Sequence, residues 1–251
     1  MLLTGRTILI TGGTSGIGRG LAETFHQLGN QVIIAGRRQP LIDEITAACP
    51  GMHGVQVNMR DPAAIAHLVD EVETLFPDLD VLVNNAGISR LEAWDGETID
   101  IATSLSIIET NIIGVLRLTA ALLPTLGRQP SATIITTTSG LAFVPRSNFP
   151  TYCASKAFLH SWLQSLRHQL RRMPIEVIEL PPPYVQTELA GALQASDPAA
   201  MPLADYLAEV VDLLQKPAPD NGEILVERVK ALRMAQQNGS YPQIYANLNP
   251  A

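Results

Sequence analysis

Residues 7–18, TILITGGTSGIG, contain a strand, a turn and the start of a helix. The β-branched run Thr7–Thr11 predicts a short buried strand, and helical spacing of apolar residues follows the turn. A glycine-rich turn between a strand and a helix lets the backbone approach a phosphate, which the helix N-terminus attracts. A plain strand–helix turn is the alternative. The context favours a dinucleotide-type turn built on Gly12, Gly16 and Gly18.

Strand and helix patterns alternate through the rest of the chain. Each strand candidate is short and mostly apolar, which is typical of a strand that is buried on both faces. Such alternation implies right-handed crossovers and a parallel sheet in one doubly wound α/β domain. The predicted strands are 7–11, 31–36, 54–58, 80–87, 132–140, 175–180 and 223–227, and the predicted helices are 19–29, 62–75 (after the cap residue Asp61), 106–123, 154–170, 203–216 and 229–237.

The composition limits the class of protein. With 251 residues and 46% hydrophobic content, we expect one domain with a sizeable core. The formal charge of −7 argues against a nucleic-acid or anionic-membrane surface. Cys49 and Cys153 offer no disulfide framework, which suits a reducing cytoplasm, and no signal sequence is recognised at the start. The longest apolar run carries Arg117, so we expect a core helix there rather than a membrane span.

Residues 139–156, SGLAFVPRSNFPTYCASK, bring a serine, a tyrosine and a lysine together. On a helix, Tyr152 and Lys156 are four positions apart and lie on one face. A separation of about 5 Å at an effective dielectric of about 20 gives roughly 3 kcal/mol, which would move the phenol pKa from about 10 towards about 8. Tyr152 would then exchange protons near neutrality, with Ser139 as a second donor to an oxyanion. A surface tyrosine beside a helical lysine is the alternative.

The strand at 31–36 ends where NAD-binding folds carry an acidic side chain for the ribose 2′-hydroxyl. Here Gly36 is followed by Arg37 and Arg38. Two guanidiniums without a carboxylate suit a 2′-phosphate, through charge-assisted hydrogen bonds. We therefore expect NADP(H) as the cofactor, with ordinary solvated arginines as the alternative.

Five motifs occur together and in a fixed order: TGGTSGIG (11–18), NNAG (84–87), Asn111, Ser139 and YCASK (152–156). In this combination the chain resembles the short-chain dehydrogenase/reductase family over about residues 5–190. Longer strings such as DLDVLVNNAGI and YCASKAFLHS resemble its branch named for teichoic-acid D-alanine esterification. The resemblance implies a single Rossmann-type domain over residues 1–251, with a mainly parallel, seven-stranded sheet flanked by helices.

The resemblance also implies roles for individual residues. Tyr152 would protonate a carbonyl oxygen, Ser139 would hydrogen-bond it, and Lys156 would hold the cofactor ribose and lower the tyrosine pKa. Asn111 would hold the lysine through water, and a locally satisfied helix asparagine is its alternative. The implied cofactor-binding residues are Gly12, Thr14, Ser15, Gly16, Ile17, Gly18, Arg37, Arg38, Asn58, Met59, Asn85, Ala86, Gly87, Tyr152, Lys156, Pro182, Val185 and Thr187.

Three positions depart from the family pattern. Asn58 stands where an aspartate is usual in the adenine contact, so an acceptor remains but its charge is lost. Pro183 replaces a glycine, which fixes φ and removes a backbone donor. The usual Asp-Gly-Gly after the last strand is absent.

We expect the substrate pocket between the Ser139–Tyr152 segment and a mobile lid over about 188–204, with a C-terminal extension over about 228–251. Apolar walls reward hydrocarbon and penalise an unpaired charge. Arg146 could pair with an anion, but it follows a proline in a predicted loop, where most arginines face water. The expected walls are Leu141, Phe143, Phe149, Tyr184 and Leu189.

The expected function is NADPH-dependent hydride transfer to or from a neutral ketone, aldehyde or secondary alcohol, as in a cytoplasmic carbonyl reductase or alcohol dehydrogenase. The alternative is a non-catalytic nucleotide-binding accessory or sensor protein linked to cell-envelope D-alanylation. A sensor would need the glycine turn, but it would not need the set Asn111, Ser139, Tyr152 and Lys156.

The sequence also gives expectations for metal binding and for the oligomeric state. No histidine has metal-ligand spacing, so we assign no metal, and Cys153 is expected to be a small buried side chain. The helices around Asn111 and after Tyr152 are apolar over more than one stripe, with Phe158 and Trp162 beyond a single core face. We therefore expect a homodimer or homotetramer packed through these helices, no nucleic acid and no membrane.

Overall fold

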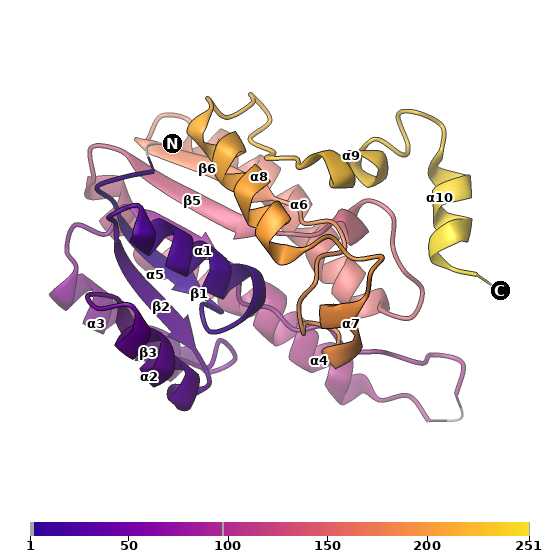
Figure 1. Ribbon diagram of the computed structural model, residues 1–251, viewed down its shortest axis with the longest axis horizontal. Helices are drawn as coiled ribbons and strands as arrows, with labels where there is room; N and C mark the ends of the chain where they lie inside the picture. Colours follow the sequence, from indigo (N-terminus) through magenta and orange to yellow (C-terminus); the bar gives the residue numbers. More distant parts are fainter. Residues whose placement is uncertain (1–2, 97, 251) are drawn as a thin grey trace.

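The computed structural model describes residues 3–96 and 98–250. Its centre is a parallel sheet of six strands in the order β3-β2-β1-β4-β5-β6 (Figure 1). The order reverses between β1 and β4, which is the switch point where such sheets bind ligands. The strands are β1 Thr7–Thr11, β2 Gln31–Gly36, β3 His53–Gln56, β4 Val81–Asn84, β5 Ala132–Thr137 and β6 Ile175–Leu180.

Helices cover both faces of the sheet. Successive residues of a strand point to opposite faces, so Ile8 and Ile10 pack under α1 and α8, whereas Leu9 packs under α3, α5 and α6. This explains why the strand sequences are apolar throughout. The helical segments are α1 Gly16–Gln27, α2 Gln39–Ala48, α3 Pro62–Leu75, α4 Ile101–Ile108, the π-helical turn η1 Glu109–Ile113, α5 Gly114–Arg128, the 3₁₀ turn η2 Gly140–Ala142, α6 Pro150–Leu170, α7 Ala192–Ser196, α8 Leu203–Gln215, α9 Glu227–Arg233 and α10 Tyr241–Leu248.

The segments α4, η1 and α5 form one continuous helical run, Ile101–Arg128. By length and composition alone it could cross a membrane, which is weak support for a span because core helices pass the same test. Leu118, Leu122 and Leu126 are fully buried against the sheet. The run therefore packs as the core helix that the sequence predicts.

The seventh strand expected at 223–227 does not form. This segment contacts β6 through a single bridge between Glu179 and Glu223, with Ile224 N donating to the Glu179 carbonyl at 2.9 Å. Val226 is already the N-cap of α9, so too few extended residues remain for a ladder. The sheet therefore has six strands where the family resemblance implied seven.

The chain end is the least embedded part of the fold. The terminal helix of the expected extension begins at Glu227, two residues earlier than predicted, and α9 packs on the turn η2. Beyond it, α10 was not predicted, and Figure 1 shows it at the edge of the molecule, away from the sheet. Within the expected lid, α7 is the regular element before α8 begins at Leu203.

Candidate active site

Four groups of candidate residues follow the carboxyl ends of β1, β4, β5 and β6. The glycine turn follows β1, Asn85–Gly87 follows β4, Ser139 follows β5 and Pro182 follows β6. Because the carboxyl ends of parallel strands share one edge of the sheet, these segments meet beside the switch point. The first turn of α6, which carries Tyr152, lies next to Ser139.

Tyr152 is a buried phenol in contact with a hydroxyl. Its side chain is 7% exposed, and burial raises its pKa to about 12, while a hydrogen bond with Ser139 offsets part of that rise. The expectation of a pKa near 8 is therefore wrong for the protein without cofactor. The Lys156 ammonium lies 5.8 Å from the ring centroid and donates to the Thr137 carbonyl at 2.8 Å, so it does not compensate for the lost hydration of a phenolate.

Lys156 is buried as well, and burial lowers its pKa to about 8. Both groups therefore hold their protons at neutral pH, because each pKa lies above 7. A protonated phenol between a hydroxyl and an ammonium is the arrangement that a general acid needs.

Asn111 lies in the π-helical turn η1, a local widening of the helix that is frequent at functional sites. Its amide accepts from Ile88 N at 2.9 Å and donates to the Ile88 carbonyl and to Ser155 Oγ. A Cβ added to Gly87 would lie 3.4 Å from Asn111 Oδ1 and 3.6 Å from Lys156 Nζ. Asn111 is thus satisfied by tertiary contacts, with its oxygen on the same side of Gly87 as the lysine.

The glycine turn is shaped by close backbone contacts. Gly12 and Gly16 have φ of +68° and +53°, and a Cβ on Gly12 would lie 2.9 Å from Ala86 Cα. A Cβ on Gly18 would lie 2.3 Å from the Gly12 carbonyl oxygen. Asn85 locks the neighbouring turn by donating to the Thr11 carbonyl at 3.2 Å. The turn therefore needs glycine for conformation and for space. Gly12 N and Gly13 N donate to the Ala35 carbonyl, so the N–H groups at the start of α1 are the ones that can face a phosphate.

A cation lies against this turn. Arg38 Nη2 donates to Ser15 Oγ at 2.8 Å and to Thr14 Oγ1 at 3.3 Å, and Arg37 beside it is exposed. A Cβ on Gly36 would lie 2.8 Å from Thr14 Cγ2, so this position has no room for a carboxylate. The structure thus brings Arg38, Ser15 and Thr14 together, as a phosphate site requires.

The remaining candidate cofactor-binding residues differ in their burial and in whether their side chain or their backbone makes contacts. The Ile17 side chain packs against the core, so only its backbone faces the turn. Thr187 lies 3.3 Å from a Cβ placed on Gly16, which brings the segment after β6 to the glycine turn. Asn58 is exposed and accepts from Arg60 N at 3.2 Å, whereas Met59 is buried against Gly114. The Pro182 carbonyl accepts from Gly140 N at 2.8 Å. Val185 is buried beside Met201.

The expected substrate walls are only partly brought together. Leu141 and Phe149 pack with Tyr152, while Tyr184 and Leu189 are exposed on the lid side, where Tyr184 donates to Asp197 at 3.0 Å. Phe143 does not join them. Its ring packs edge-on against His160 at 4.9 Å between centroids and under the Arg233 guanidinium at 5.0 Å, because α9 covers it.

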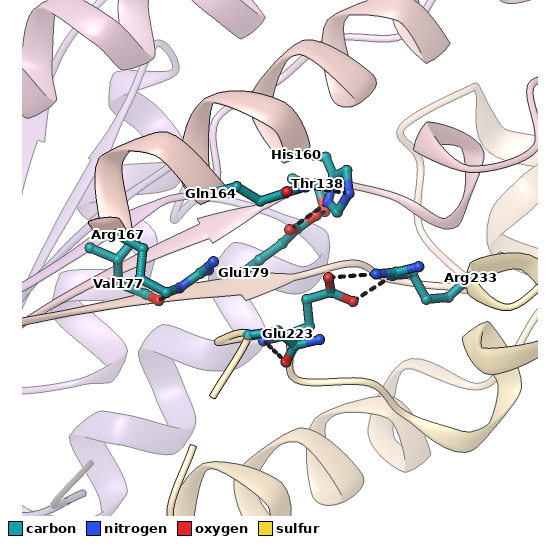
Figure 2. A network of polar contacts seen from close by, with 9 residues as sticks. Thr138, His160, Gln164, Arg167, Val177, Glu179, Glu223 and Arg233 are labelled. Carbon is teal, nitrogen blue, oxygen red and sulfur yellow. Dashed lines mark hydrogen bonds and ion pairs between the residues drawn. The ribbon is translucent and has the colours of Figure 1, made fainter. Parts of the chain in front are cut away.

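Phe143 contacts His160 and Arg233, two members of a buried polar network between α6, β6 and α9. Figure 2 shows this network. Glu179 accepts from Thr138 Oγ1 at 2.7 Å and contacts His160 Nδ1 at 2.8 Å, and Glu223 pairs with Arg233 at 2.5 and 2.9 Å. The ligand atoms of His160, Glu179 and Glu223 lie within 4.8 Å of one another, as in a metal centre. All four carboxylate oxygens already have a partner, and Arg233 supplies a positive charge, so we interpret the network as an ion-pair cluster.

A cavity of about 450 Å³ lies at the other end of α6 from Tyr152, lined by charged side chains that include Arg167, Arg171 and Asp220. It lies away from Tyr152, but Glu223 and Arg233 of the ion-pair cluster also line it. Sequence reasoning missed two sets of hydrogen bonds near Tyr152. The Glu92 carboxylate accepts from Thr151 N, and the Asn249 amide bonds with the Pro145 carbonyl and Ser147 N. Each joins residues more than 50 positions apart, which no local pattern reveals.

Comparisons with known proteins agree with this geometry. A family model described as short chain dehydrogenase matches residues 6–198. The chain is 37% identical over 252 residues to the uncharacterized oxidoreductase DltE of Bacillus subtilis, covering 99% of this chain and 98% of that protein. It resembles the structure of 3-ketoacyl-(acyl-carrier-protein) reductase from Brucella melitensis complexed with NADH, with a TM-score of 0.77 and 27% identity over 86% of this chain and 93% of that one. It equally resembles the closed form of serine dehydrogenase complexed with NADP+, with a TM-score of 0.77 and 26% identity over 84% and 90%.

Proposed function

The chain belongs to the short-chain dehydrogenase family, and from that premise we propose that it transfers a hydride between NADP(H) and a neutral ketone, aldehyde or secondary alcohol. The observation that carries the proposal is Tyr152, a buried phenol between Ser139 and Lys156 with a pKa of about 12. At neutral pH this phenol holds the proton that a nascent alkoxide requires.

The residues present fit a nicotinamide dinucleotide. Gly12 and Gly16 in the turn Gly12–Gly18 have positive φ angles, and its glycines leave space for a pyrophosphate to approach the backbone. Asn85–Gly87 and Thr187 border the turn. Lys156 and Tyr152 would hold the ribose beyond the turn. When bound in its reduced form, this cofactor supplies the hydride.

The chain's own residues would then handle the oxygen of the substrate. Ser139 donates a hydrogen bond to the carbonyl oxygen, and Tyr152 transfers its phenolic proton to that oxygen as the carbon is reduced. The Lys156 ammonium, 5.8 Å from the ring centroid, would offset part of the charge on the tyrosinate left behind. Asn111 holds the loop around Ile88 beside the lysine.

The preference for a neutral substrate rests on the side chains around Tyr152. Leu141 and Phe149 are apolar, and Tyr184 and Leu189 border them on the lid side. The nearby cation Arg146 is exposed, with its guanidinium 5.9 Å from the Phe149 ring centroid. An apolar wall penalises an unpaired carboxylate, so an aryl or alkyl ketone should react better than a 2-keto acid.

The test is steady-state oxidation of NADPH with a panel of carbonyl compounds, including an aryl alkyl ketone and a 2-keto acid of similar size. We expect the higher kcat/KM for the ketone, and Tyr152→Phe should lose about 10²–10⁴-fold in kcat with NADPH binding nearly intact. A preference for the acid would indicate that Arg146 lies in the substrate pocket and pairs with the carboxylate. Binding of NADPH without turnover of any carbonyl would favour the accessory or sensor protein instead.

A further inference from the structure

The helix that carries Tyr152 begins without a cap from its own sequence. Phe149 is the N-cap of α6, and no side chain at that position accepts from the first turn. The first N–H groups of a helix need such partners, and a carboxylate there also interacts favourably with the helix dipole.

The missing cap comes from a distant loop. Glu92 Oε2 accepts from Thr151 N at 3.0 Å, and Glu92 Oε1 accepts from the Thr151 hydroxyl at 2.7 Å. Thr151 is the second residue of α6 and directly precedes Tyr152. The backbone of Glu92 also donates to the Asn148 carbonyl at 3.1 Å, so the loop follows the chain into the helix.

The same carboxylate reaches a second helix. Ser104 Oγ, on a buried side chain of α4, donates to Glu92 Oε1 at 2.5 Å. The helical run that begins with α4 continues into η1, where Asn111 lies. One side chain therefore joins the helix of Asn111 to the first turn of the helix of Tyr152.

We propose that Glu92 is a positioning residue for catalysis, which fixes the first turn of α6 and thereby the place of the Tyr152 phenol. The inference rests on the proposed function, because it takes Tyr152 as the proton donor. A displacement of about 1 Å in a reacting group costs up to about 10²-fold in rate, so a loosened first turn lowers kcat while the glycine turn still binds cofactor.

Glu92→Ala and Glu92→Gln separate positioning by hydrogen bonds from a general effect of charge. Glutamine keeps an oxygen for Thr151 N and supplies an N–H₂ group to the hydroxyls of Ser104 and Thr151. We expect Glu92→Ala to lower kcat at least about tenfold with the NADPH dissociation constant within about twofold, and Glu92→Gln to keep kcat within about threefold. Rates are measured well below the melting temperature of each variant. Glu227→Ala, at a surface pair with Lys230, is the matched control and should behave as wild type.

A second readout does not depend on turnover. Amide hydrogen exchange at Thr151 should be at least about tenfold faster in Glu92→Ala and close to wild type in Glu92→Gln, because this N–H is bonded to the carboxylate. If Glu92→Ala does not fold, Ser104→Ala removes one of the three hydrogen bonds and should lower kcat by a smaller factor in the same direction.

The outcomes distinguish this inference from the proposed function. An active wild type with an unchanged kcat in Glu92→Ala would overturn the positioning role and leave the reductase function standing. Equal losses in kcat and cofactor affinity, or a Glu92→Gln as impaired as Glu92→Ala, would also overturn it. A wild type without any turnover would remove the reductase function, and unchanged exchange at Thr151 would then refute the cap itself.

Discussion

At the scale of single residues, Lys156 is a lysine whose burial disfavours its charged form. Its side chain is 4% exposed, and burial lowers its pKa from 10.5 to about 8. Between those two values the unfolded chain binds more protons than the folded one, so the free energy of unfolding rises with pH. The gain is complete above pH 10.5, is lost below pH 8, and is on the order of 3 kcal/mol.

Chemical denaturation from pH 7 to 10 therefore checks this lysine directly. The stability of wild type relative to Lys156→Met should improve as the pH rises through this window. The phenol of Tyr152 acts with the opposite sign, because its raised pKa costs stability between pH 10 and about 12, and measurements that stop at pH 10 avoid it. A constant difference between wild type and variant would show that the Lys156 pKa is not lowered.

Arg38 leads to a prediction about cofactor choice. Its guanidinium contacts Ser15 and Thr14 beside the glycine turn, and Gly36 excludes a carboxylate. We expect NADPH to bind more tightly than NADH, and Arg38→Ala to lose about 1.5–3 kcal/mol of NADPH affinity with little change for NADH. Calorimetric titration of both cofactors measures this, with exposed Arg60, which pairs with Glu109, as the control in Arg60→Ala. Equal affinities in the wild type would contradict the prediction.

The proximity of Tyr152 and Lys156 could be predicted from the sequence, but their ionisation could not. Tyr152 and Lys156 do lie together, as their spacing implies, because they occupy one helix. Their pKa values depend on how much water the fold removes and on the acceptor that the ammonium chooses, here the Thr137 carbonyl. Neither quantity is local in sequence, so the expected pKa of Tyr152 was wrong in direction.

At the scale of elements, the sheet was predictable where strands are buried on both faces. The runs at 7–11 and 175–180 match their strands to the residue. The run at 223–227 has a similar apolar pattern, but its last residue, Glu227, is the first residue of α9. Glu223 forms an ion pair with Arg233 at the end of that helix. The π-helical turn at Asn111 was also missed, because a widened turn shifts the apolar spacing by only one residue, which a run as apolar as Ile101–Arg128 conceals.

The C-cap residue of α10, Asn249, contacts the loop that precedes α6 through its side-chain amide. Asn249 Nδ2 donates to the Pro145 carbonyl at 3.1 Å, and Ser147 N donates to Asn249 Oδ1 at 2.5 Å. This loop carries Arg146 and leads into α6. We expect Asn249→Ala to raise the KM for the carbonyl substrate roughly three- to tenfold, the value of one or two lost hydrogen bonds, with the NADPH dissociation constant unchanged.

The matched control for Asn249 lies on the same helix. Asn247 is exposed and accepts only from Gln243 Nε2 at 3.0 Å among the contacts that the described residues show, so Asn247→Ala should leave KM unchanged. A rise in KM for both variants would point to loosening of α10 as a whole. No rise for Asn249→Ala would separate α10 from the substrate loop.

At the scale of the whole molecule, the neighbouring helices α4 and α6 carry exposed apolar side chains. Ile101, Leu105 and Ile108 on α4 are 54%, 51% and 36% exposed, at a spacing that places them on one side of the helix. Phe158 on the neighbouring α6 is 41% exposed, whereas Trp162, expected with it, packs against the core. Exposed apolar side chains gathered on one helix face are typical of interaction surfaces.

We therefore expect a homodimer or homotetramer that buries this face of α4 and α6. Leu105→Asp places a carboxylate in the middle of the contact, where it cannot keep its hydration, and should shift the assembly towards the 27.1 kDa monomer. Light scattering at micromolar concentration measures the mass, with Leu193→Asp, at an 87% exposed position on α7, as the control that keeps it. A few buried residues supply most of the binding energy of an interface, so this single substitution should suffice if Leu105 is one of them. A wild type that is monomeric at these concentrations would show that the exposed face has another role.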